Sequence, residues 1–209
     1  MGGASYRDTP TIGHENMLVL ASSSERRRAF MRLLGVEFRT HSADVDETAN
    51  EREVPTDYVL RVALAKAKAV ESESKPNTKI LAADTVVCLD GEIFGKPEGK
   101  AHAFEIYQRL SGRWHDVHTG VAFIGPQGNT ETFVVTSQVE MVCMNQVVWE
   151  AYWDSGEPQG KAGGYSIQGL GGALIRKISG SYSSVVGLPL VETVDLFNKV
   201  GIPHKFSGC

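Results

Sequence analysis

The feature that most constrains this chain is a short apolar run leading directly into three serines and three arginines. Residues 17–21 have the composition of a strand, and residues 22–28 read Ser-Ser-Ser-Glu-Arg-Arg-Arg. The apolar spacing that follows predicts a helix from Ser24 to about Gly35. A strand that runs through a short loop into a helix is a unit of α/β architecture, so we expect at least part of the fold to be α/β.

The start of this predicted helix suits an anion. Free backbone N–H groups and the positive end of the helix dipole meet at the first turn. Arginine side chains also bind phosphate oxygens through paired hydrogen bonds. Ser24 could instead be an ordinary N-cap, but a cap alone does not explain three consecutive arginines that repel one another. We therefore predict a polyphosphate-binding loop here.

Helical and strand patterns alternate along the rest of the chain without repeats. Further strands are expected at residues 36–39, 79–89, 114–124 and 132–144, and further helices at residues 56–73, 102–110, 147–155 and 190–200. Glycine is concentrated in residues 156–180. The pattern predicts one α/β or α+β unit over residues 17–209, preceded by a loose N-terminal tail at residues 1–16.

Composition narrows the function classes. The net charge of −4 argues against a general nucleic-acid surface. No apolar run approaches the roughly 20 residues that span a bilayer. Cys88, Cys143 and Cys209 are far apart and form no Cys-x-x-Cys pair, which fits a reducing compartment and argues against a structural zinc site. We expect a cytoplasmic protein whose partner is a small anion rather than a nucleic acid or a membrane.

Two acidic groups are candidates for chemistry. Asp84 is the single charge in the apolar strand expected at residues 79–89, where its carboxylate is desolvated unless a cation or a donor meets it. A buried ion pair is the alternative to a catalytic role, yet enzymes often place base or metal-binding carboxylates in such positions. Asp44, Asp46 and Glu47 form an acidic loop. That loop could be merely solvated, but phosphate chemistry with Mg²⁺ needs one or two carboxylates beside the substrate oxygens.

Two lysines are candidates for phosphate contacts. Lys66 lies in the alanine-rich helix expected at residues 56–73, where its side chain either projects into a cleft or faces solvent. Lys96 stands between Gly95 and Pro97, so a turn displays it rigidly, as suits a point-charge contact to phosphate.

The glycine-rich stretch at residues 156–172 favours close approach of the backbone to a ligand. Gln168 within it carries an amide that can both donate and accept, as recognition of a nucleobase edge requires. The stretch is neither a dinucleotide fingerprint nor a Walker A loop. His115 and His118 are three residues apart on an expected strand and should point to opposite faces, so we expect a structural role rather than a metal pair.

Taken in order, these motifs resemble the Maf family of nucleoside triphosphate pyrophosphatases. The matching segments cover nearly all of residues 17–197 in the family's order: residues 20–27, 46–48, 63–70, 83–87, 95–97, 111–120, 156–169 and 180–189. The resemblance implies an α/β fold in which a two-lobed mixed sheet and its helices surround a deep central cleft. It also implies hydrolysis of a nucleoside triphosphate to the monophosphate and pyrophosphate, with a divalent cation, Mg²⁺ or Mn²⁺, as cofactor.

The resemblance also implies roles for individual residues. Asp84 and Glu47 would hold the metal and activate water, with Lys66 and Lys96 as the other catalytic residues, at the phosphates. The implied substrate contacts are Ser22 and Arg26 on the phosphates, and Arg27, Thr85 and Gln168 on the nucleoside. No Cys or Ser has a His partner in a recognised pattern, so covalent catalysis is disfavoured.

Substrate choice follows from finer features of the resemblance. The intact Arg26 and Arg27 pair is similar to the branch that acts on dTTP and UTP. Gly160 and Ser184 stand where Asp and Asn are usual in the family, which leaves the choice of base, and of modified nucleotides, open. A nucleotide-binding regulator of cell division that does not turn over substrate is the alternative function. The oligomeric state is also open, with a homodimer as one alternative.

Overall fold

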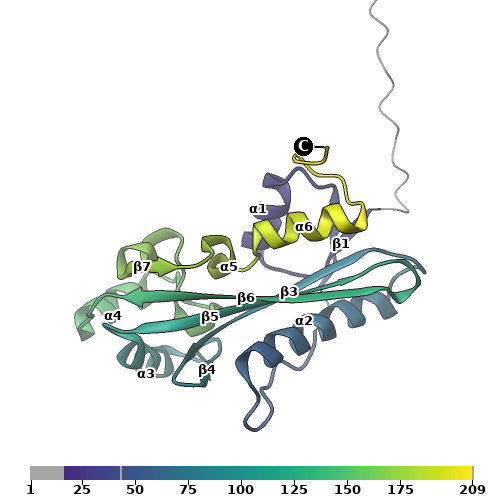
Figure 1. Cartoon of the computed structure of the whole chain (residues 1–209). Helices are drawn as coiled ribbons and strands as arrows, with labels where there is room; N and C mark the ends of the chain where they lie inside the picture. The colour runs from purple at the N-terminus through teal and green to yellow at the C-terminus, as the bar shows by residue number, and fades with distance from the viewer. Residues whose placement is uncertain (1–16, 43, 209) are drawn as a thin grey trace, which may run out of the picture.

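The computed structural model describes residues 17–42 and 44–208, so the tail expected at residues 1–16 lies outside the described residues. Within them, one seven-stranded mixed sheet has the order β2-β1-β3-β5-β6-β7, and β4 pairs with β3 off this path (Figure 1). The strands are β1 (Leu18–Leu20), β2 (Phe38–Thr40), β3 (Ile80–Leu89), β4 (Glu92–Phe94), β5 (Trp114–Ile124), β6 (Thr130–Met141) and β7 (Ile175–Ser179).

The pairing within the sheet follows the connections along the chain. β1 is parallel to β2 and to β3 because a helix crosses over between them, whereas β3, β5, β6 and β7 are antiparallel neighbours. The helices are α1 (Glu25–Leu33), α2 (Pro55–Ser72), α3 (Lys100–Leu110), α4 (Gln146–Asp154), α5 (Tyr182–Val186) and α6 (Leu190–Val200). Figure 1 shows α1 and α6 over one face of the sheet and α2 and α3 below the other.

Side chains along β3 point alternately to the two faces of the sheet and therefore pack against different helices. Leu81 and Ala83 join the core cluster that contains Met31 of α1 and Phe197 of α6. Their neighbours Ile80 and Ala82 join the cluster that contains residues of α2. Because side chains alternate between faces with a period of two, Asp84 is directed to the α2 face of the sheet and Thr85 to the α1 face.

The expected α/β class, with a mixed sheet between helices, is confirmed. The expected helices and strands are all present, with ends displaced by a few residues. Three short elements were not predicted: β4, β7 and α5. Each has five residues or fewer, and β7 lies inside the stretch that its glycines marked as irregular.

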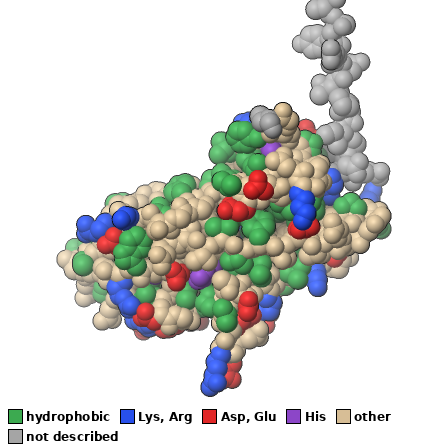
Figure 2. All heavy atoms as spheres, viewed as in Figure 1, with side chains coloured by type: hydrophobic (Ala, Val, Ile, Leu, Met, Phe, Trp, Pro, Cys, Tyr) green, Lys and Arg blue, Asp and Glu red, His purple; other side chains and the backbone are tan. Residues whose placement is uncertain are grey.

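Two surface properties bear on the expected partners. No helix in the part of the chain that the structure describes is long and apolar enough to cross a membrane. Figure 2 shows basic and acidic side chains interspersed over the face that it displays, rather than a broad basic area.

Candidate active site

The loop between β1 and α1 contains an ordinary helix cap and also lines a cavity. Ser24 is the N-cap of α1, and its Oγ accepts from the backbone N–H of Arg27 at 3.5 Å. Ser22 Oγ accepts from the backbone N–H of Ser24 at 3.1 Å and from Nη1 of Arg27 at 3.4 Å. The same loop lines a cavity of about 700 Å³, a volume typical of small-molecule sites.

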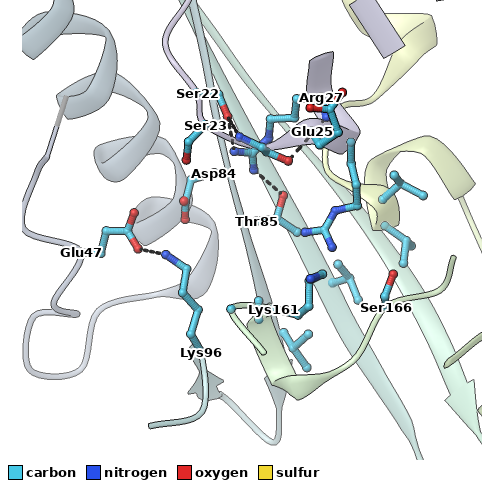
Figure 3. A pocket seen from close by; sticks show the side chains of 18 of the residues that line it. Ser22, Ser23, Glu25, Arg27, Glu47, Asp84, Thr85, Lys96, Lys161 and Ser166 are labelled. Atoms are coloured by element: carbon cyan, nitrogen blue, oxygen red, sulfur yellow. Dashed lines mark hydrogen bonds and ion pairs between the residues drawn. The ribbon is translucent and has the colours of Figure 1, made fainter. Parts of the chain in front are cut away.

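The cavity brings together eight of the nine residues expected at the site. Its walls come from the β1–α1 loop, the loop before α2, α2 itself, β3, the segment after β4, the glycine-rich stretch and α5 (Figure 3). The expected residues that line it are Ser22, Arg26, Arg27, Glu47, Lys66, Asp84, Thr85 and Lys96.

A chain of ion pairs joins two carboxylates and two lysines. Lys66 Nζ lies 2.6 Å from Oδ1 of Asp84 and 2.7 Å from Oε1 of Glu47. Lys96 Nζ lies 2.7 Å from the other oxygen of Glu47, Oε2. The side chains of Asp84 and Lys66 are only 11% and 14% exposed, so solvent screens their ion pair weakly.

Close approach of α2 to the sheet makes this arrangement possible. Gly120 of β5 is the cross-strand partner of Asp84. A Cβ atom at Gly120 would lie 2.6 Å from the carbonyl oxygen of Val59 and 2.9 Å from the backbone nitrogen of Leu60. Glycine at this position therefore lets the backbone of α2 rest directly on the sheet. Lys66 lies two turns further along the same helix and reaches Asp84 from it.

The neighbouring lysines keep Glu47 ionised. Burial by itself would raise the pKa of Glu47, but hydrogen bonds from Lys66 and Lys96 outweigh it and lower the pKa to about 2. Tyr58 Oη donates to the backbone carbonyl of Glu47 at 2.8 Å and so ties the acidic loop to α2. Burial, reinforced by the charges of Asp84 and Glu47, raises the pKa of Tyr58 to about 12.

Arg27 is held by neutral acceptors. Its Nε donates to the carbonyl of Gly187 at 2.8 Å, and its Nη2 donates to Oγ1 of Thr85 at 3.1 Å. Thr85 Oγ1 is in turn 2.9 Å from Oγ1 of Thr119, which donates to the carbonyl of Ser184. This network fixes α1, β3, β5 and α5 relative to one another at the floor of the cavity.

Two further cations that line the cavity, Arg26 and Lys161, also form no ion pair with the described residues. Arg26 Nε is buried and has no hydrogen-bond partner among the described residues, and burial lowers the pKa of the side chain. Lys161, from the glycine-rich stretch, donates to the carbonyl of Gln159 at 3.2 Å. Sequence reasoning did not assign a role to Lys161, nor to Tyr165 and Ser166, which also line the cavity.

The structure places Gln168 differently from the other expected residues. Its side chain is exposed, and Gln168 is not among the residues that line the cavity, although Ser166 and Ile167 are. Its backbone N–H donates to Oγ of Ser166 at 3.2 Å. The role of Gln168 in base recognition therefore stays a prediction. The glycine-rich stretch packs closely against β3, where a Cβ at Gly163, whose φ is +65°, would lie 2.8 Å from Val87. Its close approach to a ligand stays a prediction.

The two strand histidines have separate partners. His115 Nε2 lies 2.6 Å from Oη of Tyr165, and burial lowers the pKa of His115 to about 4. His118 Nδ1 lies 2.9 Å from Oγ1 of Thr136 on the neighbouring strand. Their three-residue separation on β5 puts the side chains on opposite faces, as predicted.

The residues present fit a divalent cation that is shared with a substrate. Among residues 17–42 and 44–208, no three His, Cys, Asp or Glu side chains gather as a metal centre. Glu47 and Asp84, however, both contact the ammonium group of Lys66, so their oxygens lie around a single point. Mg²⁺ is commonly bound by one or two carboxylates together with phosphate oxygens and water, and this donor set suits that mode.

Comparison with known proteins agrees with these features. A model of the family described as Maf-like protein matches residues 17–200. A dTTP/UTP pyrophosphatase of Methylobacillus flagellatus is 45% identical over 186 residues, covering 88% of this chain and 93% of that protein. A dTTP/UTP pyrophosphatase of Myxococcus xanthus is 46% identical over 189 residues, covering 90% and 95%.

The family match covers most of the chain and the identities exceed 40% over most of each relative, so the chain belongs to the Maf family. Among solved structures, that of the Staphylococcus aureus Ham1 protein aligns with 88% of this chain and 91% of that chain, with a TM-score of 0.48 and 16% identity.

Proposed function

We propose that this protein is a nucleoside triphosphate pyrophosphatase that hydrolyses dTTP and UTP, or close derivatives of them, to the monophosphate and pyrophosphate. The observation that carries the proposal is the chain of ion pairs among Glu47, Lys66, Asp84 and Lys96 inside the cavity. Relatives that are 45–46% identical and are named dTTP/UTP pyrophosphatases support the substrate class.

The reaction adds water across the anhydride between the α- and β-phosphates. Asp84 accepts the proton of that water, because it is a poorly exposed carboxylate whose orientation Lys66 fixes at 2.6 Å. Lys66 and Lys96 offset negative charge on the phosphates as the anhydride bond breaks. The protein forms no covalent bond to the substrate, so catalysis comes from positioning and electrostatic stabilisation.

Glu47 and Asp84 would hold a divalent cation, Mg²⁺ or Mn²⁺. Such a cation, when bound, would neutralise phosphate charge and lower the pKa of water. Glu47 is well suited to the task, since its low pKa keeps it a carboxylate at any physiological pH. Its loop is anchored by Tyr58, which limits how far the carboxylate can withdraw.

We also propose the extent of the catalytic domain and the cellular compartment of the protein. Because the cavity is lined by residues from Ala21 to Val186, we treat residues 17–209 as one catalytic domain. We place the protein in the cytoplasm, where nucleoside triphosphates are abundant and thiols such as those of Cys88 and Cys143 stay reduced.

The experiment is a metal-dependent screen of UTP, dTTP, CTP, ATP and GTP, together with base-modified uridine and thymidine triphosphates. Release of pyrophosphate and of the monophosphate is measured with Mg²⁺, with Mn²⁺ and with a chelator. The proposal expects metal-dependent release that is fastest for UTP and dTTP. Tight nucleotide binding without any pyrophosphate release would instead favour a binding regulator, and a purine preference would refute the assigned substrate class.

A further inference from the structure

Glu47 lies in the loop between β2 and α2, whose described residues, 41–42 and 44–54, form neither a helix nor a strand. Side chains, rather than a neighbouring strand, hold residues 46–48 of this loop. Oδ1 of Asp46 accepts from the backbone N–H of Thr48 at 2.8 Å, and Oη of Tyr58 donates to the carbonyl of Glu47 at 2.8 Å. The position of the loop therefore depends on a small number of side-chain contacts.

Arg61 of α2 joins the middle of this loop to its end. Its Nη2 donates to the carbonyl of Thr48, the residue after Glu47, at 2.9 Å. Its Nε and Nη2 also lie 2.6 Å and 2.7 Å from the two carboxylate oxygens of Glu53. The side chain of Glu53 is only 9% exposed, and its Oε2 accepts from the backbone N–H of Asn50 at 2.9 Å. These contacts require the planar fork of a guanidinium, because the ammonium of a lysine cannot make paired bonds to one carboxylate.

Tyr58 and Arg61 act on the loop from the same helix. They are three residues apart on α2 and so are neighbours on its surface. Cζ of Arg61 lies 5.5 Å from the centroid of the Tyr58 ring, a cation–π contact. The two side chains donate to the carbonyls of consecutive residues, Glu47 and Thr48, and neither side chain lines the cavity. Because α2 also carries Lys66, one helix positions both the lysine and the loop of Glu47.

These backbone contacts matter most during the reaction. In the structure, the carboxylate of Glu47 is held by Lys66 and Lys96, and Figure 3 shows it directed toward Lys96. In the proposed function both lysines also contact phosphate oxygens, so the substrate competes with Glu47 for them. A carboxylate that shares its side-chain partners with a substrate keeps its position only if its backbone is held.

We propose that Arg61 is a positioning residue that holds the loop of Glu47 against α2 and so keeps the carboxylate of Glu47 available to a divalent cation. The inference rests on the proposed function and deepens it by adding a residue outside the cavity, which touches neither the substrate nor the reacting atoms. A purely electrostatic role for Arg61 would have the opposite sign. Removing a positive charge near a metal site strengthens the binding of a cation, whereas losing the anchor of the loop weakens it.

The test compares the wild type with Arg61→Gln. The affinity for Mn²⁺ is measured by electron paramagnetic resonance with a non-hydrolysable UTP analogue present, and the Mg²⁺ concentration at half-maximal rate is measured from pyrophosphate release. Arg61→Gln should weaken Mn²⁺ binding and raise the Mg²⁺ midpoint by roughly tenfold, while kcat at saturating Mg²⁺ stays close to the wild-type value. Arg61→Lys keeps the charge without the paired contacts, and it should show the same loss to a smaller extent.

Arg109→Gln is the matched control. Arg109 of α3 lies 2.9 Å from a carboxylate oxygen of Glu92 and 5.5 Å from the centroid of the Phe94 ring, outside the cavity. It therefore loses the same kinds of contact as Arg61→Gln, yet it should retain the wild-type Mn²⁺ affinity and Mg²⁺ midpoint.

Hydrogen exchange adds a readout that does not depend on turnover. The backbone N–H groups of Thr48 and Asn50 should exchange faster in Arg61→Gln than in the wild type, with exchange in the second half of α2 unchanged. An unchanged or tighter Mn²⁺ affinity in Arg61→Gln would overturn the inference. A fall in kcat that saturating Mg²⁺ does not restore would also overturn it, because that result indicates damage to α2 and to the contact between Lys66 and Asp84.

Two further outcomes are covered by the same experiment. If Arg61→Gln does not fold, Arg61→Lys must show the weakened Mn²⁺ binding, and wild-type affinity in that variant would refute the role of the guanidinium. Failure of the proposed function is distinguishable, because the wild type would then release no pyrophosphate from any triphosphate. The exchange rates of Thr48 and Asn50 would still report whether Arg61 holds the loop.

Discussion

Replacing Asp84 by Asn removes the negative charge of the carboxylate and leaves the size and shape of the side chain nearly unchanged. The amide can still accept a hydrogen bond from Lys66 Nζ, which lies 2.6 Å from Oδ1 in the native protein. It can neither accept a proton from water nor offer a negative oxygen to a metal ion. Loss of a general base alone typically lowers kcat by about 10²- to 10⁴-fold, so we expect a fall of at least about 100-fold, or about 2.7 kcal/mol of transition-state stabilisation.

The fold should survive this substitution. Removing one partner of a buried ion pair commonly costs about 3–5 kcal/mol, because the other charge is left uncompensated. Lys66 here keeps a second carboxylate, Glu47 Oε1, at 2.7 Å. The loss of stability should therefore fall below that range, and the variant should still bind nucleotide.

The assay measures pyrophosphate release from UTP under saturating substrate, nucleotide affinity by calorimetry, and the melting temperature. Asp116→Asn is the matched control: Asp116 lies on the neighbouring strand β5, outside the cavity, where Oδ1 accepts from Gln138. A near-native kcat for Asp84→Asn would refute the role given to this carboxylate. A fall in kcat that Asp116→Asn reproduces would point to damage to the sheet instead.

Three further predictions address charge, base and pH. Arg26→Ala and Lys96→Ala should each weaken binding of the triphosphate more than binding of the matching nucleoside, by about 1.5–3 kcal/mol for a charge-assisted contact; equal losses for both ligands would indicate an effect through folding. Gln168→Ala should flatten the preference for UTP and dTTP over CTP, ATP and GTP in kcat/KM while sparing much of the basal rate, and an unchanged ranking would show that another part of the cavity reads the base. The pKa of Glu47 is lowered from 4.5 to about 2, so its stabilising contribution is complete above pH 4.5 and is lost as the pH falls toward 2. Urea unfolding of wild type and Glu47→Gln should accordingly differ most near neutral pH and converge near pH 2, and a gap independent of pH would contradict the assigned ion pairs.

The position of a residue in the cavity could be predicted from the sequence where its neighbours along the chain carry the information. Asp84 stands out because every residue around it in β3 is apolar or small, and strand periodicity alone assigns Asp84 and Thr85 to opposite faces. The alanines around Lys66 on α2 left two orientations open for its side chain, toward a cleft or toward solvent, and it was the family resemblance that assigned Lys66 to the site.

Lys161 was missed because the sequence around it does not show which distant segments it meets. Nothing near Lys161 signals that the glycine-rich stretch lines the same cavity as the loop between β1 and α1. Gln168 shows the opposite difficulty: its chemistry suits a nucleobase, but an irregular stretch has no periodicity from which the direction of its side chain follows. The strand β7 was missed for a related reason, since five residues at the edge of a sheet carry little pattern.

Gly120 extends the functional region beyond the residues that a ligand can touch. Gly120 is not among the residues that line the cavity, yet a single added methyl group would collide with the backbone of α2 and push Lys66 away from Asp84. In a mutational survey, Gly120 should therefore behave like a catalytic position although it contacts no substrate. A search for inactivating variants that is confined to the wall of the cavity would overlook it.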